Sequence, residues 1–298
     1  MKEKKKWALG CLVLLVLFLT GAGIMLAMLR FMVPSMKNQI PIGGDKVAVV
    51  RIEDVIYSSE KTVDRIMELK EQSSVKALLL RINSPGGGVA PSQEIYEAVR
   101  SFRESGKPVV ASLGAVAASG GYYIACAADT IMANPGTVTG SIGVIFEFPY
   151  IADLLKKIGV DMEVIKSGKF KDAGSPSRKI TAEERALFQG VINDTWDQFV
   201  GAVADGRGMD EKDVRAIADG RIFTGRQALD AGLVDTLGTF EDAKMLAKVM
   251  AGLPADAEVF EQEKARRIFD MLFGDTEELL RLKGRLLPGG VSFLFTGK

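Results

Sequence analysis

The fold of this chain is decided by the stretch VKALLLRINSPGGG, residues 75–88. Residues 75–82 form an almost unbroken apolar run, which is typical of a strand buried on both faces of a sheet. The segment Asn83-Ser84-Pro85 and three glycines then end the run and predict a tight turn. Glycine lets a ligand approach the backbone N–H groups of such a turn because no Cβ is in the way.

Strands and helices are predicted to alternate on both sides of this stretch. Residues 47–52 and 108–113 are short apolar runs, whereas residues 62–72 and 93–103 have apolar positions at helical spacing. This alternation predicts an α/β fold with a mostly parallel sheet. It leaves open whether the sheet is doubly wound or forms a spiral of ββα units.

A long helix is predicted at residues 181–203, and shorter ones at 210–218 and 225–231. Thr181 is a suitable N-cap, and Glu183 and Glu184 place acidic groups in the first turn. The apolar positions of the long helix favour core packing and subunit contact; they are Leu187, Val191, Trp196, Phe199 and Val200.

The N-terminal residues predict a membrane anchor. Residues 1–6 are basic, and residues 7–29 carry no charge over a length sufficient to cross the ~30 Å hydrocarbon core as a helix. The lysines before the span place the N-terminus in the cytoplasm and the rest of the chain outside it. The alternative is a cleaved signal peptide, for which residues 20–23 offer a cleavage site.

We therefore expect a cytoplasmic tail (1–6), a transmembrane helix (7–29), a linker (30–45), a catalytic domain (46–250) and a C-terminal extension of unassigned role (251–298). The 38 basic and 38 acidic residues balance, which gives no reason to expect nucleic acid as a partner. With no histidine and only Cys11 and Cys126 as cysteines, neither a metal site nor a disulfide is predicted.

The run ASGGYY, residues 118–123, places Ser119 at the start of a predicted helix. A serine nucleophile needs a base, and the absence of histidine makes lysine the leading candidate. Lys166, Lys169 and Lys171 follow what the pattern predicts to be the end of a strand, and the residues alone leave the choice open. Because only a neutral lysine can accept a proton, the site has to be enclosed.

Backbone N–H groups are the predicted oxyanion donors. Gly86 and Gly87 supply them from the glycine turn, and Gly120 supplies one at the start of the serine's helix, where the helix dipole assists.

Four motifs occur in order: SPGGG (84–88), ASGGYY (118–123), TGSIGV (139–144) and SG-x-x-K (167–171). Together they resemble the signal peptide peptidase A family over about residues 45–245, in its short form because no motif is repeated. The resemblance implies a Clp-protease/crotonase-like spiral and a Ser/Lys dyad of Ser119 and Lys171. It also implies an oxyanion turn at Gly86 and Gly87 and a lysine-orienting role for Ser141.

The resemblance further implies a membrane-anchored serine endopeptidase that degrades released signal peptides and similar apolar peptides. Such an enzyme needs no cofactor, assembles into a ring-like homo-oligomer, and lies in the bacterial cytoplasmic (inner) membrane with its catalytic domain outside the cytoplasm. Two alternatives stand beside it, a crotonase-type acyl-CoA enzyme and an inactive membrane scaffold. Whether one chain supplies both dyad residues is left open.

Overall fold

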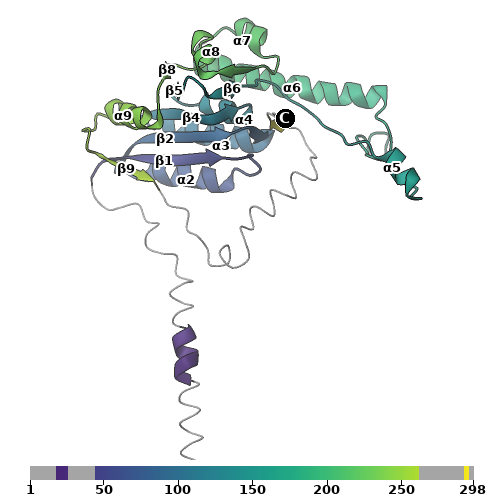
Figure 1. Cartoon of the computed structure of the whole chain (residues 1–298), viewed down its shortest axis with the longest axis horizontal. Helices are drawn as coiled ribbons and strands as arrows, with labels where there is room; N and C mark the ends of the chain where they lie inside the picture. The colour runs from purple at the N-terminus through teal and green to yellow at the C-terminus, as the bar shows by residue number, and fades with distance from the viewer. Residues whose placement is uncertain (1–17, 26–43, 262–291, 295–298) are drawn as a thin grey trace, which may run out of the picture. The chain divides into compact units, whose positions relative to one another are not determined.

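The computed structural model describes residues 18–25, 44–261 and 292–294 (Figure 1). Residues 18–25 are helical and belong to one compact unit, and the other described residues belong to a second. The predicted tail and most of the predicted span, linker and C-terminal extension lie outside the described residues. Of the helices that are described, none has the length and apolar character needed to span a membrane.

The second unit is built on a sheet whose described strands are mostly parallel. Its path runs, in spatial order, through β7 (Ile222–Thr224), β6 (Val138–Gly140), β4 (Val109–Ala118), β2 (Val75–Ser84), β1 (Lys46–Glu53) and β9 (Glu258–Glu261). β5 (Thr130–Ala133) pairs with β4 and with β8 (Thr236–Leu237). Only β6 and β7 pair antiparallel among the described strands of this sheet. The prediction of an α/β fold with a parallel sheet is confirmed.

The central strands are buried on both faces, which explains their nearly continuous apolar sequences. Val47, Val49, Ala77 and Leu79 pack in a cluster with alanines of α9 (Phe240–Met250). The intervening residues of β1 and β2 point to the opposite face and are also buried. The elements α2 (Glu60–Glu71), α3 (Val89–Glu104) and α4 (Gly120–Ala125) contact β1, β4 and β2 respectively.

β4 pairs with two strands in succession along one edge. Residues 110–113 of β4 pair with β5, and residues 116–118 pair with β6. Its register with β2 also shifts between Ile82 and Ser84. The carboxyl end of β4 is therefore fixed between β6 and the end of β2, and the next residue in the chain is Ser119.

The long helix α6 (Ala182–Arg207) begins where the sequence predicts, after a capping box formed by Thr181 and Glu184. In its carboxyl half, Phe199, Val200 and Val203 are buried, whereas Leu187 and Val191 in its amino half are more than 40% exposed. Figure 1 shows this amino half extending beyond the sheet, near α5 (Ala152–Lys157). The helices predicted at 210–218 and 225–231 are present as α7 (Glu211–Ile217) and α8 (Gly225–Asp230).

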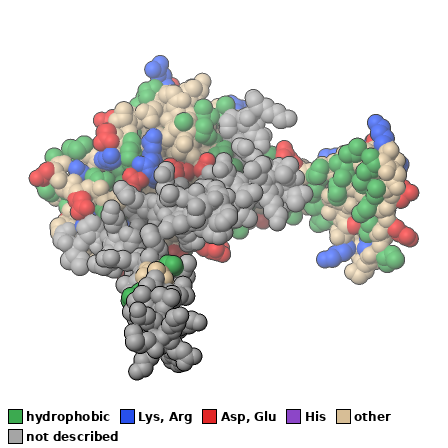
Figure 2. Space-filling model, turned by 60° about the horizontal axis from the view of Figure 1, so that its bottom comes forward, with side chains coloured by type: hydrophobic (Ala, Val, Ile, Leu, Met, Phe, Trp, Pro, Cys, Tyr) green, Lys and Arg blue, Asp and Glu red, His purple; other side chains and the backbone are tan. Residues whose placement is uncertain are grey.

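The strand predicted before the lysine loop is wrong, because residues 158–180 contain neither helix nor strand. Ile165 is 95% exposed and Val164 46%, so this apolar run pairs with none of the strands that the structure describes. We call residues 146–180 the arm. Figure 2 shows hydrophobic side chains gathered on its surface.

Candidate active site

Ser119 joins β4 to α4 with an unusual backbone conformation. Its φ is +53° and its ψ −119°, a region that residues other than glycine rarely adopt. The Ser119 amide donates to the Gly140 carbonyl at 2.8 Å, and its carbonyl accepts from Tyr123 N at 2.8 Å. A strained serine on a sharp strand-to-helix turn is a common arrangement for a hydrolase nucleophile.

Ser141 lies beside this turn and has a similar backbone. Its φ is +51° and its amide donates to Arg221 O at 2.8 Å. Phe223 of β7 packs so closely against Gly140 that a Cβ there would come 2.6 Å from its ring. β7 therefore supports the segment that holds both serines.

The glycine turn forms the short strand β3 (Gly86–Gly88), which lies close to the start of α4. A Cβ on Gly120 would come 2.5 Å from Ser92 Oγ and 3.3 Å from Gly87 N. Only glycine at position 120 allows this approach, because the contacting groups are buried and a side chain would displace them. The structure thus brings Gly87 and Gly120 together next to Ser119.

The N–H groups of β3 are not equivalent. Gly86 N donates to Ser84 Oγ at 3.1 Å, and Gly88 N donates to Ile56 O at 2.8 Å. Because successive N–H groups of a strand point to opposite sides, Gly87 N faces away from Ile56. Of the two glycines predicted in the turn, the geometry favours Gly87 as the donor, since the Gly86 N–H is already used within the turn.

The C-terminal strand β10 (Ser292–Leu294) pairs antiparallel with β3, with Phe293 opposite Gly87. It also contacts α4, and Figure 1 shows it at that place. An extended segment of the chain therefore occupies the glycine strand beside Ser119. The sequence did not indicate this role for the C-terminal extension.

Lys171 lies in a turn of the arm and is exposed. Its amide donates to Gly168 O at 3.1 Å. The turn is held by Arg178, which donates to Asp172 and to Glu184 in the first turn of α6. On its other side, Gly174 has a φ of +77° and packs against the ring of Phe148, where a Cβ would come 2.4 Å from the ring.

The structure does not bring Lys171 to Ser119 within one chain. α4 contacts the carboxyl half of α6, where the rings of Tyr123 and Phe199 lie 5.1 Å apart. From Glu184 to Phe199 the helix spans about 22 Å at 1.5 Å per residue, far beyond the reach of a lysine side chain. No hydrogen bond in the described part of the chain joins the Lys171 side chain to Ser119 or Ser141.

Comparisons with known proteins identify the family. The model of peptidase family S49 matches residues 101–254, and that of Clp protease matches residues 48–137. A Synechocystis sp. protein named as a protease is 48% identical over 212 residues, which cover 71% of this chain and 76% of the relative. An Enterococcus faecium protein named as signal peptide peptidase SppA is 41% identical over 187 residues, 63% of this chain and 54% of the relative.

The chain belongs to peptidase family S49. The prediction of the signal peptide peptidase A family is thereby confirmed. Protease 4 of Haemophilus influenzae is 35% identical over 226 residues, which cover 72% of this chain but 36% of that longer protein. The chain is thus a protease with peptide substrates, and the crotonase-type alternative is set aside.

A cavity of about 450 Å³ lies beside Ser141 of this S49 peptidase. The loop after β6 contributes Ser141 and residues 143–145, and α6 contributes Ile192, Asn193 and Trp196. Trp196 is fixed in the wall by a 2.8 Å hydrogen bond from Nε1 to Ala218 O. The cavity has room for a long side chain that approaches Ser141 from the solvent.

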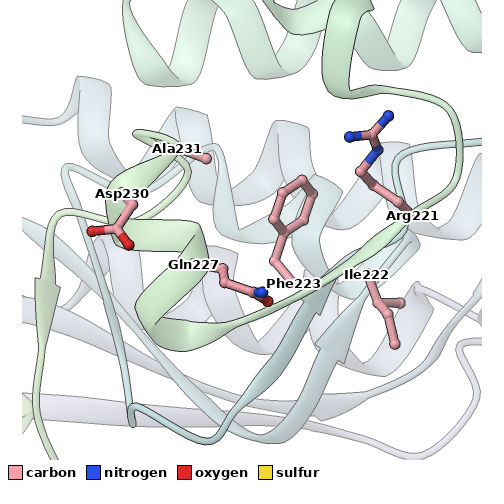
Figure 3. Close-up of a pocket in the computed structure, with 6 residues that line it drawn as sticks. All are labelled: Arg221, Ile222, Phe223, Gln227, Asp230 and Ala231. Atoms are coloured by element: carbon pink, nitrogen blue, oxygen red, sulfur yellow. The ribbon is translucent and has the colours of Figure 1, made fainter.

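A second cavity, of about 420 Å³, lies beside β7 and α8 of the peptidase (Figure 3). Arg221, Phe223, Gln227 and Asp230 are among its lining residues, and no predicted site residue is. Figure 3 shows Phe223 between Arg221 and Gln227. Arg221 connects this cavity to the candidate site, because its carbonyl accepts from Ser141 N.

Cys126 is not a competing nucleophile for the peptidase. It is buried, and burial raises the pKa of its thiol to about 12, so the thiolate is scarce at neutral pH. Tyr122 is also buried and donates to Leu233 O at 2.7 Å, so its side chain is part of the core. No group of residues suited to hold a metal ion occurs in the described ranges.

Proposed function

We propose that this S49 protease is a membrane-anchored serine endopeptidase in which Ser119 is the nucleophile and Lys171 of a neighbouring copy is the base. One observation carries the proposal. Ser119 has a strained backbone beside β3, and an extended segment lies antiparallel on that same strand. A peptide bound as β10 is bound would pass directly by the serine.

The chemistry follows from these positions. The Ser119 hydroxyl attacks the scissile carbonyl carbon while the neutral Lys171 amine accepts the hydroxyl proton. The N–H groups of Gly87 and Gly120 donate to the oxyanion that forms. The lysine then returns the proton to the departing amine, and water hydrolyses the acyl-enzyme by the same sequence of proton transfers.

Assembly of several copies would bring the two residues together. The arm is exposed and apolar at Leu154, Ile158, Met162 and Ile165, which are 57% to 95% exposed, and such a patch is typical of a protein interface. A neighbour's arm that covers this surface could insert Lys171 into the cavity beside Ser141, whose hydroxyl would orient the amine. A closed ring repeats this contact without leaving an open end.

The proposal keeps the predicted organisation, with an anchor at 7–29 and a catalytic domain at 46–250 outside the cytoplasm. Pairing of β9 with β1 adds residues 258–261 to the catalytic sheet. The substrates we propose are released signal peptides and similar apolar peptides. The uncharged span of residues 7–29 and a relative named SppA support this choice.

Labelling and turnover test the assignment. A serine-directed acylating reagent should label the wild-type protein but not Ser119→Ala, and peptide cleavage should be lost with the label. Lys171→Ala should be inactive, and Lys171→Arg should not restore activity because guanidinium does not lose its proton. Lys166→Ala and Lys169→Ala should keep substantial activity.

Labelling of Ser119→Ala at the wild-type level would remove Ser119 as the nucleophile. A wild-type protein that neither takes the label nor cleaves peptides would instead favour the inactive scaffold.

A further inference from the structure

Arg178 holds the turn that carries Lys171. Its Nε donates to Asp172 Oδ2 at 2.9 Å, and its Nη2 donates to the Asp172 carbonyl at 3.1 Å. The same guanidinium donates hydrogen bonds to both carboxylate oxygens of Glu184. One planar group thus joins the residue next to Lys171 to the first turn of a long, rigid helix.

This network is well enclosed for a surface feature. The side chain of Glu184 is 3% exposed and that of Asp172 is 12% exposed. Glu184 also accepts from Thr181 N at 2.9 Å as part of the capping box. Hydrogen bonds from Arg178, and then from Lys166, hold the pKa of the Asp172 carboxyl well below its usual value. The hydrogen bonds from Arg178 likewise lower the pKa of Glu184 to about 2, so both carboxyl groups remain ionised beside the turn at neutral pH.

The charged side chains around Lys171 form ion pairs with one another, and none of these pairs includes Lys171. The charged side chains of this turn and of the first turn of α6 are Lys166, Lys169, Lys171, Asp172, Arg178, Lys179, Glu183, Glu184 and Arg185. Asp172 pairs with Lys166 and Arg178, Glu184 with Arg178, and Glu183 with Lys169. Each carboxylate in this described segment therefore has a cation other than Lys171. The cavity beside Ser141 that would receive the amine is also lined by Asp219, and this carboxylate pairs with Arg221.

Such sorting matters for a lysine that has to be neutral. A carboxylate within reach of an amine stabilises the ammonium form and so opposes proton acceptance. Asp172 is the nearest carboxylate along the chain to Lys171, and the fixed guanidinium of Arg178 occupies it.

We propose that Arg178 is a positioning residue for the base: it ties the Lys171 turn to α6 and keeps the adjacent Asp172 carboxylate from pairing with the Lys171 amine. The inference rests on the proposed role of Lys171. It adds a residue outside the dyad on which both the presentation and the protonation of the base depend.

The test measures kcat and KM against pH for the full-length oligomer with an apolar fluorogenic peptide. Arg178→Gln should raise the pH midpoint of the kcat/KM profile by about one unit, because the Asp172 carboxylate loses the fixed guanidinium and keeps only the Lys166 side chain as a cationic partner. At neutral pH kcat should fall about tenfold, as a one-unit shift requires. KM should stay within about twofold, since Arg178 is placed to act through the lysine turn and not on the peptide.

Two further variants separate this role from simple stabilisation. Adding Asp172→Asn to Arg178→Gln removes the released carboxylate and should return the pH midpoint to the wild-type value. Arg178→Lys keeps the positive charge but loses the several N–H donors of the planar guanidinium. It should therefore keep the wild-type pH midpoint while lowering Tm. The matched control is Arg51→Gln, which breaks a comparable bidentate pair with Glu261 on β9 and should leave the pH profile unchanged.

An unchanged midpoint in folded Arg178→Gln would overturn the inference, and so would a midpoint that Asp172→Asn does not restore. If Arg178→Gln fails to fold, Arg178→Lys is used instead. The inference predicts that this variant keeps the wild-type midpoint, so a shifted midpoint would overturn it. Lys171→Ala distinguishes the two levels of the argument. Activity in Lys171→Ala refutes the proposed base itself, whereas an inactive Lys171→Ala with a wild-type profile in Arg178→Gln refutes only the role of Arg178.

Discussion

Mixing two inactive variants should restore peptidase activity if neighbouring copies share the site. Ser119→Ala keeps a working lysine, and Lys171→Ala keeps a working serine. The Lys171 turn is tied to Glu184, which lies about 22 Å along α6 from the point where α4 packs. Because a rigid helix separates them, neither variant can complete a site from its own residues, but each can supply what its neighbour lacks.

The expected yield follows from the geometry of a closed ring. Each site takes its serine from one copy and its lysine from the next. Random assembly of equal amounts of the two variants leaves about one quarter of the sites with both residues intact. Activity should therefore reach about 25% of the wild-type value at equal mixing and fall on either side of that ratio.

The assay uses co-expression of the two variants with different affinity tags. Passage over both affinity columns in sequence isolates mixed oligomers, and cleavage of a fluorogenic apolar peptide measures their turnover. Oligomers of either variant alone provide the background. Mixed oligomers that contain both tags but show no activity above this background would refute the shared site, because a dyad within one chain cannot be restored by mixing.

Three further outcomes follow from individual contacts. Phe293→Pro should lower KM for peptides, because proline opposite Gly87 removes a ladder hydrogen bond and frees β3; an unchanged KM would show that the tail does not compete. Gly120→Ala should lower kcat about 100-fold by displacing an oxyanion donor. Adding Ser92→Ala removes the atom that a Cβ on residue 120 would approach to 2.5 Å and should recover part of the lost kcat; an equal kcat in the single and the double variant would contradict this explanation. Glu184→Gln should lower Tm at pH 6, and the difference should shrink as the pH falls from about 4.5 toward about 2, where the lowered pKa of Glu184 lies; thermal melts across this range would refute the pairing if the difference stayed constant.

Much of the fold could be predicted because its signals are local. The apolar run that became β2 and the capping residues before α6 act over a few neighbouring positions. The prediction of a strand ahead of the lysines was wrong because it too was based only on a local signal. Val164 and Ile165 have a strand-like composition, but a strand forms only where another strand offers its backbone groups, and none of the described strands lies beside the arm.

The sequence by itself determined the chemistry that this protein has available. The absence of histidine, the serine at a helix start and the glycine turn restricted the catalytic groups to hydroxyl, amine and backbone N–H. The tertiary structure alone decided how they are arranged. It turned the N–H of Gly87 rather than that of Gly86 away from Ile56, and it paired Phe293 with β3. It also held Lys171 near the first turn of α6, at the end of the helix away from Ser119. These outcomes depend on contacts between residues distant in sequence, for which no local pattern exists.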